Sequence, residues 1–132
     1  MTKILNTLAH ELQPEQIEEI QKEFGQYQIT DLRDHGGITK HQYHMIRQTP
    51  PVDEDDEIPY VFANLIAEYD VALLPAGSPA LMWIVAQQLQ GLTTTIGFAH
   101  TQRMTTEKKE HGQTVKTTTF QHNCWQWLGG AE

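Results

Sequence analysis

Residues 75–79 have the composition of a phosphate-binding turn, Pro-Ala-Gly-Ser-Pro. Gly77 lets the backbone approach a ligand closely, because glycine has no side chain and accepts a positive φ. Ser78 suits the N-cap of a following helix, and Pro79 suits its first position. The N-terminus of such a helix presents unpaired N–H groups and the positive end of the helix dipole. This pattern predicts an anion site, with an ordinary capped turn as the alternative.

Histidine occurs in two places where it could do chemistry. His10 follows a predicted strand, so it would lie at the same rim of a parallel sheet as residues 75–79. There it could donate a hydrogen bond to phosphate or transfer a proton, or it could be a loop histidine without a function. His35, His41 and His44 have a spacing that a metal site could use. No cysteine or His-Glu signature completes a ligand set, so we expect exposed histidines and no metal.

Three residues of the predicted C-terminal hairpin bring positive charge or an imidazole ring: Arg103, Lys116 and His122. Lys116 and His122 are six residues apart on one predicted strand, so strand alternation places them on one face. The alternative for these cations is a cross-strand ion pair with Glu107 or Glu110. The signatures of nucleophile-elbow hydrolases, P-loop ATPases and CxxC zinc sites do not occur in the sequence.

The charge of the chain limits its partners. Seventeen acidic and nine basic residues give a net charge of −8, which disfavours binding along a nucleic-acid polymer, since that requires clustered Lys and Arg. A compact anion remains possible, because it needs only a local positive patch and a few backbone N–H groups. Much of the negative charge lies in residues 53–57, which we expect to form a solvated loop.

The length of 132 residues predicts one domain, residues 1–132. No run approaches the roughly 20 apolar residues of a membrane-spanning helix, and the first residues lack the pattern of a secretory signal. Cys124 is the single cysteine, so it cannot form an intrachain disulfide, and we expect a small buried side chain. Together these features predict a cytoplasmic protein that does not bind membranes.

Strands and helices are predicted to alternate through the first two thirds of the chain. The clearest helix spans residues 14–24, with apolar residues at helical spacing and Gly25 just past its end. Residues 80–89 are apolar nearly all round, which predicts a helix buried on more than one side. The other expected elements are strands 4–9, 26–32 and 71–74, a weakly indicated helix 39–47, and a helix 59–69.

Residues 93–127 are rich in Thr, Val, Phe and Trp, which favours two strands, and His111-Gly112 predicts the turn between them. By strand alternation His122 and Cys124 would share one face and Trp125 would lie on the other. The alternation of strands and helices predicts a mainly parallel sheet covered by helices, to which this hairpin adds antiparallel strands. The predicted fold class is α/β, a Rossmann-type three-layer domain with a C-terminal β-hairpin.

Short motifs at both ends of the chain resemble those of a known family. At the start, Ile4-Leu5-Asn6, His10-Glu11-Leu12 and Pro14-Glu15-Gln16 resemble the opening of small stand-alone CRISPR-associated proteins. In those proteins the first strand runs into His-x-Leu-Thr-x-x-Gln, and here Gln13 takes the place of the threonine. The residues that resemble the terminal hairpin of one such family are Arg103, Met104, Glu107, Gly112, Lys116, Phe120 and His122. With the central strand, loop and helix, the resemblance spans most of the chain.

The resemblance implies a CARF-like domain that binds cyclic oligoadenylate, the second messenger of type III CRISPR antiviral defence. Such domains form homodimers and hold the ligand across the two-fold axis. Some members cut it and are called ring nucleases: a ribose 2′-hydroxyl attacks the adjacent phosphorus, without metal or other cofactor, and the protein supplies geometry and charge stabilisation.

The residues that match carry the implied functions. His10, Gly77 and Ser78, with Pro79 opening the helix, would bind the ligand. The hairpin residues Arg103, Lys116 and His122 would stabilise the transition state. Cleavage of cyclic tetra-adenylate would switch off type III CRISPR signalling.

Two other functions stay open at the level of sequence. The protein could capture the cyclic ligand as a sensor or sponge without cutting it, because binding needs the same loops and cations. It could also be a Rossmann-like protein that binds another nucleotide or a phosphorylated metabolite at residues 75–79.

Overall fold

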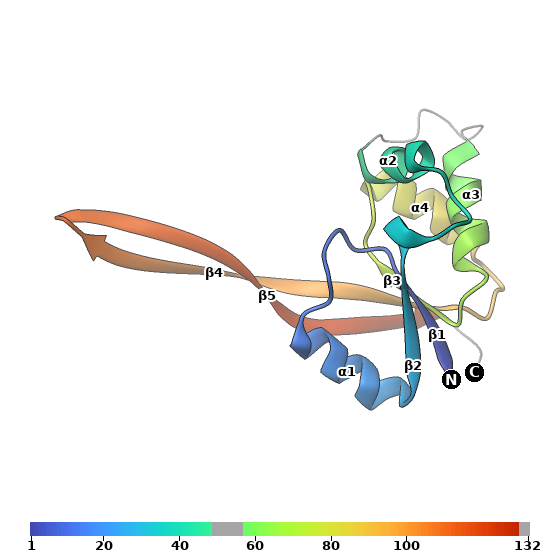
Figure 1. The fold of residues 1–132 in the computed structure, drawn as a ribbon, viewed down its shortest axis with the longest axis horizontal. Coiled ribbons are helices and arrows are strands. Elements are labelled where there is room, and N and C mark those ends of the chain that lie inside the picture. Colours follow the sequence, from blue (N-terminus) through green and yellow to red (C-terminus); the bar gives the residue numbers. More distant parts are fainter. Residues whose placement is uncertain (49–56, 130–132) are drawn as a thin grey trace.

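The computed structural model describes residues 1–48 and 57–129 and contains one five-stranded sheet of order β2-β1-β3-β4-β5 (Figure 1). β1, β2, β3 and β4 pair in parallel, and β5 is antiparallel to β4. The strands are β1 (Thr2–Asn6), β2 (Tyr27–Asp31), β3 (Val71–Leu74), β4 (Thr95–Glu110) and β5 (Gln113–Gly129). The helices are α1 (Pro14–Phe24), α2 (Lys40–Gln48), α3 (Glu57–Ile66) and α4 (Pro79–Gln88), with a short 3-10 helix at Leu32–Asp34. The predicted α/β class, mainly parallel with a C-terminal hairpin, is confirmed.

The local signals in the sequence explain where several elements begin and end. α1 has the predicted bounds, and the backbone N–H of Gln13 donates to the Gln16 side chain at its start (2.8 Å). The predicted helix 39–47 is confirmed as α2. Its start is stabilised because Thr39 and Gln42 exchange side-chain to backbone hydrogen bonds of 2.9 and 3.0 Å. The predicted strand 4–9 is too long. β1 ends at Asn6, whose side-chain oxygen accepts from the N–H of Leu8 (3.1 Å) and turns the chain.

Helices cover both faces of the sheet (Figure 1). On one face, Ile20 of α1 packs against Ile4 of β1 and Val71 of β3. On the other face, α2, α3 and α4 pack against the alternate residues of the same strands, including Leu5 and Ala72. Because successive strand residues point to opposite faces, these two parallel strands contribute to both cores.

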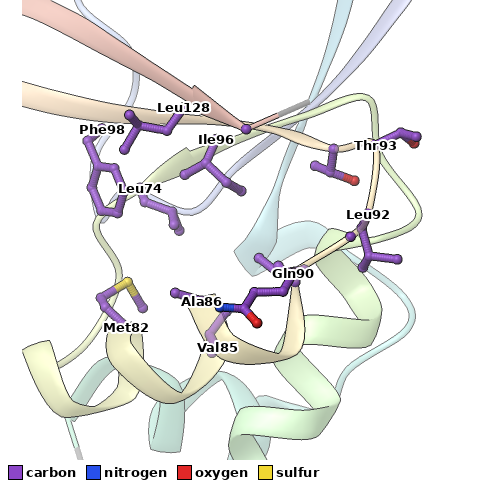
Figure 2. A pocket seen from close by; sticks show the side chains of 14 residues that line it. Leu74, Met82, Val85, Ala86, Gln90, Leu92, Thr93, Ile96, Phe98 and Leu128 are labelled. Atoms are coloured by element: carbon purple, nitrogen blue, oxygen red, sulfur yellow. The ribbon is translucent and has the colours of Figure 1, made fainter. Parts of the chain in front are cut away.

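The prediction that the helix over residues 80–89 is buried on more than one side is wrong. Only Leu81 and Val85 of α4 are buried, and Trp83 is 68% exposed. α4 packs against α3, and another side of it borders an apolar space that β4 and β5 also line (Figure 2). Its outward side therefore presents apolar side chains to solvent. No described helix is both long enough and apolar enough to cross a membrane.

β4 and β5 continue far beyond the rest of the sheet as a two-stranded ribbon (Figure 1). β4 pairs with β3 only from Thr95 to Phe98, whereas its pairing with β5 runs on to Glu110 and Gln113. Residues 101–119 are all exposed, and we call them the arm. The predicted turn is confirmed: His111-Gly112 connects the strands with positive φ angles of 53° and 77°.

A register shift at the base of the arm changes which side chains face α1. His100 pairs with Cys124, but the next residue, Thr101, pairs with His122, so Asn123 is an extra residue on β5. Such a bulge reverses the alternation along the strand. His122 and Trp125 are consequently both buried, with ring centroids 5.5 Å apart, and Cys124 is exposed. The predictions that Cys124 is buried and shares a face with His122 are therefore wrong.

Glu19 of α1 fastens this part of β5. Its carboxylate accepts from the backbone N–H of Trp125 (3.1 Å) and lies 3.1 Å from Nε2 of the His122 ring. The indole N–H of Trp125 in turn donates to the backbone carbonyl of Gln16 (3.2 Å). The base of the arm is thus tied to α1 by polar contacts as well as by packing.

We expect Glu19→Ala to lower the free energy of unfolding by about 1–3 kcal/mol, because it leaves buried polar groups of Trp125 and His122 without their partner. The matched control is Glu18→Ala, which removes an exposed carboxylate from the neighbouring position of the same helix and should change stability by less than about 0.5 kcal/mol. Urea unfolding followed by tryptophan fluorescence measures both. Equal values for the two variants would show that the Glu19 contacts do not stabilise the fold.

Candidate anion site

The C-terminal end of α2 packs against the edge of the sheet at which the parallel strands end. Arg47, in the last turn of α2, donates from its guanidinium Nη2 to the backbone carbonyl of Thr7, just past β1. Its Nε donates to the hydroxyl of Tyr43 (3.2 Å), and the guanidinium lies 5.3 Å from the centre of that ring. These contacts hold a half-buried positive charge at the carboxyl edge of the sheet.

The same helix end also touches the loop after β3. Gly77 has a φ of +71°, and a Cβ built on it would overlap the backbone carbonyl oxygen of Ile46 and lie 2.8 Å from the Leu81 side chain. The sequence predicted a close approach at Gly77, and here the group that approaches is α2 of the same chain. Gly77 therefore lets α2, and with it Arg47, come close to the β3–α4 loop.

Ser78 and Pro79 start α4 as the sequence predicts. The Ser78 hydroxyl accepts from the backbone N–H of Leu81 (3.2 Å), with extended backbone angles at the cap, and Pro79 occupies the first turn. The Ser78 side chain is half-buried and Pro79 is exposed. The positive end of the α4 dipole thus opens on the carboxyl edge of the sheet, where an anion is stabilised.

A second polar cluster at this edge lies on the β2 side and is largely acidic. The Asn6 amide donates to Asp31 (2.9 Å), which pairs at the last rung of β1 and β2. Arg33 lies 3.8 Å from each of three carboxylates, those of Asp31, Asp34 and Glu11. By contrast, within the described part of the chain no carboxylate lies within 4.0 Å of Arg47. The edge is therefore divided into an acidic side around Arg33 and a positive side around Arg47.

His10 is exposed and follows β1 at this same edge, as predicted. Its Nδ1 lies 2.7 Å from the backbone carbonyl oxygen of Glu11, and its own carbonyl accepts from the Asn6 amide (3.4 Å). The loop that carries His10 is thus linked to Asn6 at the end of β1.

The three hairpin cations lie elsewhere and apart from one another. Arg103 is five residues beyond Phe98, which pairs with Leu74 at the end of β3, so it lies roughly 16 Å farther along the arm. Lys116 forms an ion pair with Glu107 (3.6 Å), which is the cross-strand alternative that its position suggested. Along one strand it is roughly 20 Å from His122.

His122 is enclosed rather than facing the carboxyl edge. Its side chain is only 2% exposed, and within the described residues its Nδ1 is buried without a hydrogen-bond partner. Among the described residues, Glu19 is the one polar partner of its Nε2. Within one chain, His10, the loop of Gly77 and Ser78, and Arg47 therefore all lie at the carboxyl edge of the sheet. His10 lies on the side of Asn6, and α2 with Arg47 lies on the side of Gly77. His122 and the arm cations lie elsewhere.

Sequence reasoning missed Arg47 and the polar residues at the ends of β1 and β2. The available signal was positional: Asn6 and Asp31 lie at the ends of two predicted parallel strands, where ligand-binding side chains gather. Arg47 carried no such signal, because it lies on the least legible predicted helix. Its place at the edge follows only from how α2 packs.

Beside α4 lies an apolar cavity of about 530 Å³, between this helix and strands β4 and β5 (Figure 2). Its walls include Met82 and Val85 of α4, Ile96 and Phe98 of β4, and Leu128 of β5. None of the described residues that line it carries a charge. The cavity can take an apolar or aromatic group but not a phosphate.

Among residues 1–48 and 57–129, no three His, Cys, Asp or Glu side chains lie close enough together to hold a metal ion. His41 and His44 are exposed on α2, and the Nδ1 of His35 accepts from the backbone N–H of Gly37 (2.8 Å). The acidic stretch 53–57, expected to be a solvated loop, lies outside the described residues except for Glu57, which begins α3.

Comparison with known protein families finds one match over nearly the whole chain. Residues 2–126 match the family described as "Uncharacterized protein MJ1673 family". No curated protein and no solved structure matches the chain.

We expect Gly77→Ala to destabilise the protein by more than Gly25→Ala. Both glycines have a positive φ, of 71° and 73°, which costs an alanine roughly 1–2 kcal/mol. Only at Gly77 would the new methyl group also overlap the Ile46 carbonyl, which adds roughly 1–3 kcal/mol, whereas nothing lies within 4 Å at Gly25. Chemical denaturation compares the two variants, and an equal loss would show that α2 does not pack closely on Gly77.

Proposed function

We propose that this chain, which belongs to the MJ1673 family, binds a cyclic oligoadenylate at the carboxyl edge of its sheet. The observation that carries the proposal is the position of Arg47, held between the loop after β1 and the loop that begins α4. A guanidinium and a helix N-terminus at one place are the two groups with which proteins most often bind phosphate.

The electrostatics of the edge favour a compact anion over a polymer. Arg47 is half-buried, so its charge is screened less by solvent than that of an exposed cation. The chain as a whole is strongly acidic, with a net charge of −8, and would repel a long nucleic acid. A small cyclic polyanion can bind at Arg47 and the start of α4 without contacting the acidic surface.

The apolar cavity supports a nucleotide in preference to a free phosphate. Met82, one of its lining residues, lies one helical turn beyond Ser78, and Phe98 lies beside the end of β3. A phosphate at the start of α4 could therefore carry a base that packs against these apolar side chains. Adenine suits such a cavity, because its ring is planar and it stacks on aromatic and thioether groups.

A cyclic tetra-adenylate has repeated phosphates and bases, so it suits a homodimer in which each copy supplies one Arg47 and one Ser78 loop across a two-fold axis. Cleavage is the proposed second step. The ribose 2′-oxygen forms a bond to the adjacent phosphorus, the bond from phosphorus to the 5′-oxygen breaks, and the proton of the 2′-hydroxyl is replaced by one on the 5′-oxygen. The product is a linear chain that ends in a 2′,3′-cyclic phosphate, and no metal or cofactor is consumed.

Of the three hairpin cations, Arg103 is the one that can assist this step, because Lys116 is ion-paired and His122 is enclosed. Its distance of roughly 16 Å from the end of β3 means that it would act on a ligand shared by two copies. The distance of Arg103 from the end of β3 also favours a second candidate function. In that function the protein is a sensor or sponge that captures the ring without opening it.

Isothermal titration with cyclic tetra-adenylate tests binding. We expect Arg47→Gln to weaken the affinity by about tenfold or more, because a charge-assisted phosphate contact contributes roughly 1.5–3 kcal/mol. The control is Lys40→Gln, which removes an exposed cation from the other end of α2 and should leave the affinity unchanged. Circular dichroism checks that both variants are folded. No binding by the wild type, together with thermal stabilisation by a mononucleotide, would select a different phosphorylated ligand.

Incubation with labelled cyclic tetra-adenylate in EDTA tests cleavage. The wild type should open the ring, and Arg103→Ala should lower turnover while leaving thermal unfolding nearly unchanged, because an exposed arm cation contributes little to stability. Ring cleavage by Arg103→Ala at the wild-type rate would remove the arm from the reaction. An intact ring at high excess of a wild-type protein that binds it would establish the sensor or sponge.

A further inference from the structure

Within residues 1–48 and 57–129, nothing packs on the arm that would explain its length. From residue 101 to residue 119 every residue is exposed, and the only described strand that pairs with each strand of the arm is the other one (Figure 1). A two-stranded ribbon by itself is marginally stable in water, because it buries little apolar surface while ordering each residue costs roughly 1–2 kcal/mol. A projecting ribbon of this length is therefore a surface on which another molecule is expected to lie.

The arm differs in charge from the rest of the chain. Residues 101–119 contain four basic side chains and two acidic ones, a net charge of +2. Since the whole chain carries −8, the remaining residues carry −10. Two of the arm cations, Lys108 and Lys116, pair with the arm carboxylates Glu110 and Glu107, at 3.4 and 3.6 Å. Arg103 and Lys109 account for the excess.

The strongest run of opposite charge on the described surface is on α1 and the loop before it. Between residues 11 and 23 there are five glutamates and one lysine, and Glu15, Glu18 and Glu23 are exposed. The arm is long enough to cross this helix. From Thr101 to Glu110 it extends roughly 30 Å, whereas the eleven residues of α1 span roughly 16 Å.

We propose that the arm docks on the acidic α1 surface of a second copy of this chain. In a two-fold dimer each copy gives its arm to the other and receives one in return, so the basic arm and the acidic helix are both used twice. The positive charge of the arm would attract a nucleic acid, but the ten net negative charges on the rest of the chain would repel it. The contact needs no ligand, and it supplies the association on which the proposed shared ligand site depends.

Analytical ultracentrifugation at low salt tests this directly, without ligand. The wild type should sediment as a dimer of 15.1 kDa chains and dissociate as salt is raised, because the contact is electrostatic. A variant in which Asn-Gly replaces residues 103–120, joining the paired residues Gln102 and Gln121, should be a monomer with an unchanged body by circular dichroism. A wild type that is monomeric, or a shortened variant that still dimerises, would overturn the proposal.

Charge reversal identifies the docking surface even where the shortened arm fails to fold. Lys108→Glu/Lys109→Glu should weaken the dimer about tenfold, since each substitution occurs twice in a symmetric pair. The control, Lys3→Glu/Lys40→Glu, makes the same change in net charge on exposed residues outside the arm. It should not weaken the dimer. Mixing the arm variant with Glu15→Lys/Glu18→Lys should restore association as a heterodimer. Failure of this rescue, or arm-dependent binding of an oligonucleotide by a monomer, would contradict docking on α1.

These outcomes are separate from those for the ligand. A dimer that does not bind cyclic tetra-adenylate would keep the arm contact and remove the proposed function. A monomer that binds it tightly would remove the arm contact and keep ligand binding, but at a site formed by one copy.

Discussion

The contact of the α2 end with two loops is the interaction on which the candidate site depends. The Arg47 guanidinium donates to the Thr7 carbonyl after β1, and the Ile46 carbonyl lies against Gly77 after β3. One helix end therefore sets the spacing of two loops that come from neighbouring parallel strands. It also brings the half-buried positive charge of Arg47 to an edge whose other side, around Asp31, is acidic. A side chain at position 77 would displace α2, and Arg47 would move with that helix.

The distribution of charge explains how such an acidic chain could act on a polyanion. Four of the nine basic residues lie on the arm, and Arg47 lies at the carboxyl edge, whereas the chain as a whole carries a net charge of −8. The arm is held at a fixed place by its base, where Glu19 accepts from the Trp125 N–H and the bulge at Asn123 turns both His122 and Trp125 toward α1. The direction of the arm thus depends on a contact between α1 and β5 that lies far from the candidate site in sequence.

Local signals predicted most of the fold. The helix at Pro14–Phe24, the capped start of α4 at Ser78 and the turn at His111-Gly112 all depend on neighbouring residues, so the sequence carries them plainly. The errors have a different origin. The shared face of Cys124 and His122 was inferred from strict alternation, which one inserted residue reverses, and no sequence signal marks a bulge at that position. The burial of Cys124 was inferred from its residue type alone, which does not fix the face on which it lies.

Two further differences from the prediction have a similar cause, because both depend on packing between distant parts of the chain. Apolar residues all round α4 suggested a buried helix, but the burial of a helix depends on what packs against its outer side, and Trp83 is exposed. Arg47 reached the site through the packing of α2, which lies about 40 residues from Thr7 along the chain. Predicted site residues on loops after parallel strands, such as His10 and Ser78, do lie at the expected edge, because the direction of the strands fixes that position.

The central claim is that a cyclic oligoadenylate binds where α2, the loop after β1 and the start of α4 meet. The most direct measurement is the change in backbone amide NMR shifts during titration with cyclic tetra-adenylate. The account predicts the largest changes at residues 77–81, at Thr7 to His10 and at Arg47, with smaller changes at the Met82 end of the apolar cavity. Saturable changes confined to the exposed outer side of α4 around Trp83, or the absence of any change, would contradict it.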